Sequence, residues 1–410
     1  MFKDHYDLEL SCASASACAA YLAGLDNALR LDQPGILELT AAIDQDAEFA
    51  LAHAALGRQL QIHGFRNEAS GHLDKAVALK SAATKREQSA VDVIVAAARF
   101  QDNALEVANG HMQEFPRDVF ILSHLVGPFG LLAFSGQASW REDNVALLQA
   151  LESSYPAEDW WYLSTRSFMA AEVGDLRAAR RFGEHAWRLD ENGNCAHSLA
   201  HVHFEESAVD EGVDFINKWM LAHGAESDMR HHLVWHLALL LRNKGAPAAE
   251  LLAIYEHELD PAISDPMPLS TFSDNAALLW RCKLSGLEIP ASISQDLAAY
   301  ADKHYRTYGF AFADIHRVMS TGLANNAAEQ RTLIEGLGRL ADSEGTPLAN
   351  AMLRYAEGFC AFANQDFALA IERLEPVLAD SVLLGGSNPQ RRVVAETYEA
   401  ALAARGGLHG

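Results

Sequence analysis

The chain has 410 residues, of which 50% are hydrophobic and 21% are charged. This composition supports a large buried core, so it excludes disordered, collagen-like and small disulfide-stapled proteins. The 55 acidic and 32 basic side chains give a formal charge of −23, which repels phosphate backbones and anionic membranes. We therefore expect neither nucleic acid nor a membrane as a partner.

The cysteines indicate the compartment. They are scattered, odd in number and never in a C-x-x-C pair: Cys12, Cys18, Cys195, Cys282 and Cys360. Such a set is typical of a reducing compartment rather than of a disulfide framework or a thiolate zinc site. The N-terminus also carries acidic residues where a secretory signal needs positive charge. These features predict a cytoplasmic protein.

Helices are predicted along the whole chain, beginning with the small-residue stretch 11–24. Apolar residues recur at intervals of three and four, and no segment alternates as a strand does. The uncharged stretch 119–140 is long enough to cross a bilayer. Gly127-Pro128-Phe129-Gly130 lies in its middle, however, so we expect two short core helices around a turn.

The helices are predicted to form repeated pairs. Gly57 and Ala69 lie twelve residues apart on either side of a turn, and Gly358 and Ala370 repeat that spacing. A third copy spans residues 159–190. These offsets resemble the tetratricopeptide repeat, a helix pair of about 34 residues. Neighbouring pairs must stack to bury their apolar faces, so we predict an all-α, right-handed superhelical solenoid of tetratricopeptide-like helix pairs in a single domain spanning residues 1–410.

Two later segments interrupt the predicted pattern. Residues 256–290 are expected to form an irregular insertion. Residues 379–390 are expected to form a longer loop before the last helix.

Histidines concentrate in the middle of the chain. Seven of the eighteen lie between residues 197 and 236, and they include two H-x-x-x-H pairs, His197/His201 and His232/His236. A spacing of four places both imidazoles of a pair on one helix face. The pairs lie 35 residues apart, which is one repeat, so we expect them on adjacent helices. The apolar run 233–241 predicts burial, and burial favours the neutral imidazole that binds protons or metals.

Six motifs together resemble the tetratricopeptide repeat protein 38 family. They lie in the same order along essentially the whole chain, at residues 49–56, 196–205, 232–239, 274–281, 312–316 and 385–391. The resemblance implies a helical repeat fold and implies no particular reaction. The turn at residues 206–208 departs from the pattern because it lacks a glycine.

A metal centre is one interpretation of the histidines. Helix axes pack about 8–10 Å apart, so His197, His201, His232 and His236 can converge on one divalent ion. Asp274, or the pair formed by Asp314 and His316, is the candidate for a further ligand or an orienting carboxylate. The H-E-x-x-H signature is absent.

Acid–base chemistry without a metal is another interpretation. The candidate catalytic residues are His201, His236, Asp274 and His316, with an imidazole transferring the proton and Asp274 or Asp314 orienting it. The candidate ligand-binding residues are His197, His232, Trp235, Trp280, Arg281 and Asp314. Arg281 would hold an anionic group.

Each of these residues also has a structural interpretation. The histidines can form a hydrogen-bonded network between repeats, and the tryptophans can be core side chains. Asp274 can be the N-cap of a helix that begins there, and Arg281 can complement the dipole at its far end.

Taken together, the sequence predicts a helical repeat protein whose concave groove holds a histidine-rich pocket for a peptide or small polar ligand. The alternative is an enzyme of hydrolase or lyase type that uses the same cluster, with or without the assistance of a metal. The sequence leaves open whether a reaction is catalysed, which cofactor is bound and how many copies assemble.

Overall fold

The computed structural model describes residues 2–33, 35–225 and 227–407. These residues form two compact units, which we describe separately. The first unit comprises residues 1–135 and 139–233, and the second comprises residues 136–138 and 234–410. The single domain expected from the sequence therefore stays a prediction.

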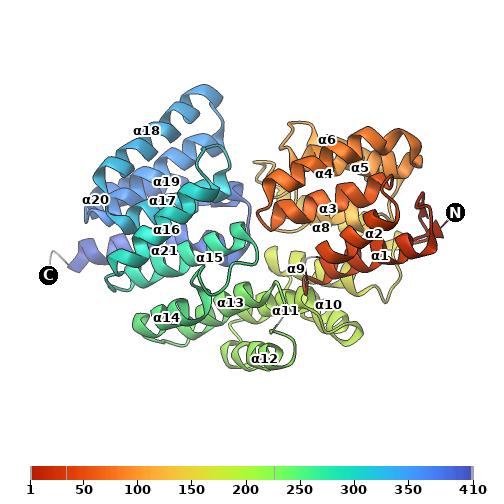
Figure 1. The fold of residues 1–410 in the computed structure, drawn as a ribbon. Coiled ribbons are helices and arrows are strands. Elements are labelled where there is room, and N and C mark those ends of the chain that lie inside the picture. The colour runs from red at the N-terminus through yellow and green to blue at the C-terminus, as the bar shows by residue number, and fades with distance from the viewer. Residues whose placement is uncertain (1, 34, 226, 408–410) are drawn as a thin grey trace. The chain divides into compact units, whose positions relative to one another are not determined.

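The first unit contains a short hairpin and a series of helices, coloured red to green in Figure 1. Its elements in chain order are β1 Phe2–Lys3, β2 Glu9–Leu10, α1 Ala15–Arg30, α2 Ile36–Gln45, α3 Ala50–Ile62, α4 Arg66–Leu79, η1 Lys80–Ala82, α5 Lys85–Ala98, α6 Ala104–Glu114, α7 Val119–Leu125, α8 Trp140–Ala150, η2 Glu152–Ser154, α9 Trp160–Glu172, α10 Leu176–Leu189, α11 Gly193–Glu205, α12 Val209–Ala222 and the first residues of α13 Arg230–Asn243.

The second unit continues from within α13. Its further elements are α14 Ala248–Ile254, the π-helical turn η3 Tyr255–Leu259, α15 Pro268–Leu284, α16 Ala291–His304, α17 Ala311–Ala324, α18 Ala327–Glu344, α19 Pro347–Ala363, α20 Phe367–Leu374, η4 Glu375–Val377, η5 Ala379–Leu384 and α21 Asn388–Gly407.

Consecutive helices pack in pairs, and the pairs repeat. In the first unit α3 packs on α4 and α9 on α10, while α3 also contacts α5 and α9 contacts α11. α3 and α5 begin 35 residues apart, at Ala50 and Lys85, and α9 and α11 begin 33 apart, at Trp160 and Gly193. In the second unit α17 contacts α19, and α19 packs on α20. Each unit is therefore built from the helical repeat that the sequence predicts.

Small residues let the helices of a pair approach closely. A Cβ atom at Gly57 of α3 would lie 2.8 Å from Cγ of Leu73 on α4, and one at Gly358 of α19 would lie 2.6 Å from Cγ of Leu374 on α20. Such distances are too short for packed carbon atoms. The glycines that marked the repeat in the sequence are thus required by the crossing of the helices.

Four segments differ from the sequence prediction. After α7 ends at Leu125, residues 127–135 form turns rather than a second helix. Residues 256–290 are mostly regular, because they contain most of the π-helical turn η3 and the whole buried helix α15, which begins at Pro268. Residues 379–384 form the 3₁₀ helix η5 rather than a loop. The strand pair β1–β2, with Phe2 opposite Leu10, was not predicted.

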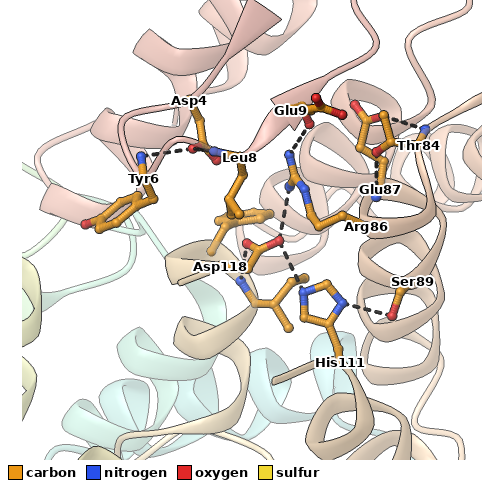
Figure 2. A network of polar contacts seen from close by, with 12 residues as sticks. Asp4, Tyr6, Leu8, Glu9, Thr84, Arg86, Glu87, Ser89, His111 and Asp118 are labelled. Atoms are coloured by element: carbon orange, nitrogen blue, oxygen red, sulfur yellow. Dashed lines mark hydrogen bonds and ion pairs between the residues drawn. The ribbon is translucent and has the colours of Figure 1, made fainter. Parts of the chain in front are cut away.

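A buried polar network joins this hairpin to α5, α6 and α7 (Figure 2). Arg86 of α5 donates to Oδ2 of Asp118 at 3.0 Å and to the carbonyl of Glu9 at 2.9 Å. Nε2 of His111 lies 3.2 Å from the same Oδ2, and its Nδ1 lies 2.9 Å from Oγ of Ser89. Burial alone would raise the pKa of Asp118, but the hydrogen bond from His111 and the charge of Arg86 lower it.

No helix in the described part of the chain is both long and apolar enough to cross a membrane. All five cysteines are buried thiols without a disulfide. Cytoplasmic location stays a prediction.

Candidate metal and ligand site

The paired histidines lie on the first helices of two successive pairs, α11 and α13. α11 begins after Asn192, whose side chain accepts a hydrogen bond from the backbone N–H of Cys195 at 3.0 Å. This N-cap fixes where the helix starts, so His197 and His201 lie one turn apart on one face. α13 presents His232 and His236 in the same way.

Buried serines set the position of α11 on α9. Oγ of Ser198 lies 3.0 Å from the carbonyl oxygen of Ser164 and 2.8 Å from its hydroxyl oxygen. Both serines are buried, and a buried hydroxyl needs a hydrogen-bond partner. The serine pair therefore favours a single register of α11 against α9, and with it the position of His201.

The loop before α13 is held by other parts of the first unit. Oγ of Ser227 donates to the carbonyl of Leu31 at 3.0 Å. Nε2 of His63, at the end of α3, lies 3.0 Å from Oδ2 of Asp228. These contacts fix the start of the helix that carries His232.

Three imidazole nitrogens converge between α11 and α13. Nε2 of His197 lies 2.9 Å from Nε2 of His201 and 3.1 Å from Nε2 of His232. His236, one turn further along α13, completes a histidine cluster in which one ligand atom from each residue lies within 4.8 Å of the others. The predicted approach of the two H-x-x-x-H pairs is confirmed.

The spacing of the histidine cluster matches a metal donor set. Nitrogen ligands at 2.0–2.1 Å from a tetrahedral zinc ion lie about 3.3 Å apart. A neutral Nε2 either donates one proton or offers one lone pair. His197 therefore cannot donate to His201 and His232 at once, whereas one cation can accept a lone pair from all three rings.

The cluster is largely shielded from solvent. His201, His232 and His236 are buried and His197 is half-buried. The ring of Phe168 on α9 lies 4.4 Å from that of His201 and 5.4 Å from that of His197, between centroids. Burial, followed by the neighbouring imidazoles, lowers the pKa of His197 well below its ordinary value. The ring is therefore neutral at pH 7, as a metal ligand must be.

The remaining predicted site residues belong to the second unit. Asp274 lies inside α15 and accepts a hydrogen bond from Oγ of Ser270 at 3.0 Å, so the expectation that it caps a helix is wrong. Arg281 donates to Glu396 at 2.8 Å and to the carbonyl of Pro389 at 2.6 Å. Both residues are buried, and their roles toward a ligand stay predictions.

His316 and Asp314 lie on α17 and are also buried. Nδ1 of His316 lies 2.6 Å from the carbonyl oxygen of Phe312, so this nitrogen carries the proton of the neutral ring. Burial lowers the pKa of His316 to about 4, although the charge of Asp274 raises it. Asp314 accepts from the backbone N–H of Gly309 at 2.8 Å, and burial raises its pKa to about 6.

The two tryptophans are core side chains. Nε1 of Trp280 donates to Oγ1 of Thr397 at 2.9 Å, and its ring stacks on Phe359 with centroids 5.1 Å apart. Trp235 packs beside His236 on α13, with ring centroids 5.0 Å apart. Both tryptophans are fully buried, as the structural interpretation of helically spaced aromatics expects.

Phe168 and Ser164 were not among the predicted site residues. Both lie one repeat before residues of α11, since Phe168 precedes His201 by 33 positions and Ser164 precedes Ser198 by 34. Extending the repeat backwards from the histidines would have identified the α9 side chains that face them.

No protein-family model matches the chain. Among solved structures, the TPR domain of P58(IPK) is 13% identical, with a TM-score of 0.22, over 96% of this chain and 99% of that one. A chain of the Naa15/Naa10 complex bound to HypK-THB is also 13% identical, with a TM-score of 0.23, over 95% of this chain and 68% of that one. Membership of the tetratricopeptide repeat protein 38 family stays a prediction, while the repeated helix pairs of each unit establish a helical repeat protein.

Proposed function

We propose that this chain is a helical repeat protein that binds a divalent transition metal through His197, His201 and His232, with His236 as the fourth donor. The observation that carries this proposal is the convergence of three Nε2 atoms, at 2.9 and 3.1 Å, from helices one repeat apart. Imidazole nitrogen suits zinc, copper, nickel and iron, whereas magnesium and calcium prefer oxygen. Zinc is the reference ion because four nitrogen ligands suit its tetrahedral geometry.

In this proposal, the peptide or small polar ligand expected from the sequence binds at the metal. His197 is half-buried while the other three rings are buried, so a ligand would reach the ion from the side of His197. A carboxylate, an amine or a thiol could then displace one imidazole or add to the coordination sphere.

The test begins with protein stripped by a chelator and titrated with Co²⁺. Tetrahedral cobalt absorbs visible light strongly, so we expect a d–d band that saturates at one ion per chain and that zinc displaces. His201→Ala or His232→Ala should abolish the band. His203→Ala is the matched control, because this histidine is a buried neighbour on α11 outside the cluster. A chain that binds neither ion would overturn the proposal.

A metal-assisted hydrolase or lyase is the second candidate function. It is favoured by the close approach of the Nε2 atoms of three histidines, His197, His201 and His232. Catalytic zinc sites have three protein ligands and one open position. It requires zinc-loaded protein to turn over a substrate in a panel of esters, amides and peptides. Turnover should disappear in His201→Ala and persist in His203→Ala. In His236→Ala, activity should persist only if His236 is not a ligand.

A further inference from the structure

The outer face of α10 concentrates positive charge on this acidic chain. Four arginines fall within the twelve residues 177–188, although the whole chain carries a formal charge of −23. Together with Glu184 and Glu206, they line an open hollow of about 450 Å³. The four arginines and the hollow belong to the first unit and lie outside the histidine cluster.

Packing of the opposite face fixes the direction in which these arginines point. Ala179, Gly183 and Ala186 form the buried face of α10. A Cβ atom at Gly183 would lie 2.7 Å from Oγ of Ser167 on α9 and 2.9 Å from a methyl group of Leu199 on α11. The helix therefore cannot rotate about its axis, and Arg177, Arg181 and Arg188 remain exposed.

Carboxylates already neutralise one of the four arginines. Nε of Arg180 donates to both carboxylate oxygens of Glu206, at 3.1 and 2.9 Å, and further ion pairs join Arg180 to Glu184 and Glu211, each at 3.4 Å. Both glutamates of the hollow are thus engaged by Arg180. The hydrogen bonds that Arg180 donates to Glu206 are the largest cause, and together these contacts raise the pKa of Arg180.

The other three arginines have no carboxylate within 4 Å in the described ranges of the chain. Arg177, Arg181 and Arg188 appear in no ion pair of those ranges. Arg181 instead lies over the ring of Phe182, with its guanidinium carbon 4.7 Å from the centroid, and Arg166 covers the same ring at 4.2 Å. Stacking restrains Arg181 and leaves its N–H donors available to a partner.

The spacing of the three charges indicates the size of the partner. At 1.5 Å per helical residue, Arg177 and Arg188 lie about 16 Å apart along the axis, with Arg181 between them. A single phosphate or carboxylate ion cannot bridge that distance. An extended peptide covers it in about five residues. Nucleic acid is disfavoured because the rest of the chain repels a long phosphate backbone.

We propose that Arg177, Arg181 and Arg188 form a docking surface for an extended acidic segment of a partner protein. Each guanidinium pairs with a glutamate or aspartate side chain of that segment. The strongly negative remainder of the protein repels acidic chains and so confines their binding to this face. The surface requires no metal, and it is independent of the function proposed for the histidine cluster.

The experiment measures fluorescence anisotropy of a labelled ten-residue peptide in which glutamate alternates with alanine. We expect binding at low ionic strength, loss of binding near 0.5 M salt, and no binding of the matching glutamine peptide. The triple variant Arg177→Ala/Arg181→Ala/Arg188→Ala should bind at least about tenfold more weakly. The matched control is Lys303→Ala/Arg331→Ala/Arg339→Ala, which removes three exposed charges from the second unit and should bind as the parent does.

The docking surface would be overturned if the glutamate peptide did not bind at low salt, or if the two triple variants lost binding equally. Full displacement of the peptide by equimolar inorganic phosphate would overturn it too. Tighter binding of a single-stranded RNA of equal charge would also overturn it, by assigning the surface to nucleic acid. Because all six substituted residues are exposed, both variants should keep the circular dichroism spectrum and melting temperature of the parent.

Discussion

His197 and His232 lie 35 residues apart in the sequence, and their Nε2 atoms lie 3.1 Å apart in the fold. The separation is one repeat, so the contact joins the first helix of one pair to the first helix of the next. An ion held between them would cross-link successive repeats. Under the proposed function, metal binding would therefore stabilise this part of the solenoid.

Zinc is expected to stabilise the folded chain. A ligand that binds only the folded state at 100 times its dissociation constant adds about 2.7 kcal/mol to the free energy of unfolding. Differential scanning fluorimetry of chelator-stripped protein should show a rise in melting temperature with added zinc. The rise should be lost in His232→Ala and retained in His203→Ala. Equal rises in both variants would place the zinc elsewhere.

The sequence predicts the repeat well because packing of a helix pair depends on local spacing. The glycines at 57 and 358 mark close crossings that the structure contains, and the 35-residue separation of the histidine pairs places them together. In each case the residues that matter lie one repeat or less apart, so periodicity alone locates them.

Contacts between distant segments were not predictable in this way. Arg86 donates to the carbonyl of Glu9, 77 residues away, and His63 meets Asp228 across 165 residues. Neither partner carries a periodic signal. The start of α15 was also not predicted: the helix begins at Pro268, where the fixed φ of proline suits the first helical position.

Asp118 is expected to be the most sensitive member of the network in Figure 2. It is buried and contacts Arg86 and His111, so Asp118→Ala leaves a buried guanidinium without its carboxylate. We expect a loss of about 3–5 kcal/mol in the free energy of unfolding, measured with urea. Asp92→Ala, which breaks an exposed ion pair with Lys80, should cost less than about 1 kcal/mol. Similar losses would show that burial of the network contributes little.

Ser207 and Gly174 occupy comparable turns and should respond oppositely to substitution. Ser207 has φ 56° in the turn that lacks a glycine, and Gly174 has φ 82° in the preceding pair. A Cβ atom at Gly174 would meet nothing within 4 Å, so only backbone strain opposes a side chain there. Gly174→Ala should lower the free energy of unfolding by about 1 kcal/mol, and Ser207→Gly should raise it by about 0.5 kcal/mol. Destabilisation by Ser207→Gly would mean that its side chain stabilises the turn.

His316 should make stability depend on pH. Burial lowers its pKa from 6.5 in the unfolded chain to about 4 in the folded one. Between these values the unfolded state binds the proton and the folded state does not. The contribution of His316 to the free energy of unfolding is therefore fully present above about pH 6.5 and is lost as the pH drops toward 4. The difference in pKa corresponds to a loss of about 3 kcal/mol.

Replacing the imidazole should remove that contribution. Urea unfolding of His316→Leu between about pH 7 and pH 4.5 should give a shallower decline in the free energy of unfolding than the parent shows. Asp314 is present in both proteins, so its own raised pKa cancels in the comparison. His257→Leu is the matched control, since His257 is exposed in the folded chain and should leave the decline unchanged. Parallel curves for His316→Leu and the parent would mean that His316 has the same pKa in the folded and the unfolded chain. Water or a carboxylate would then have to reach its Nε2.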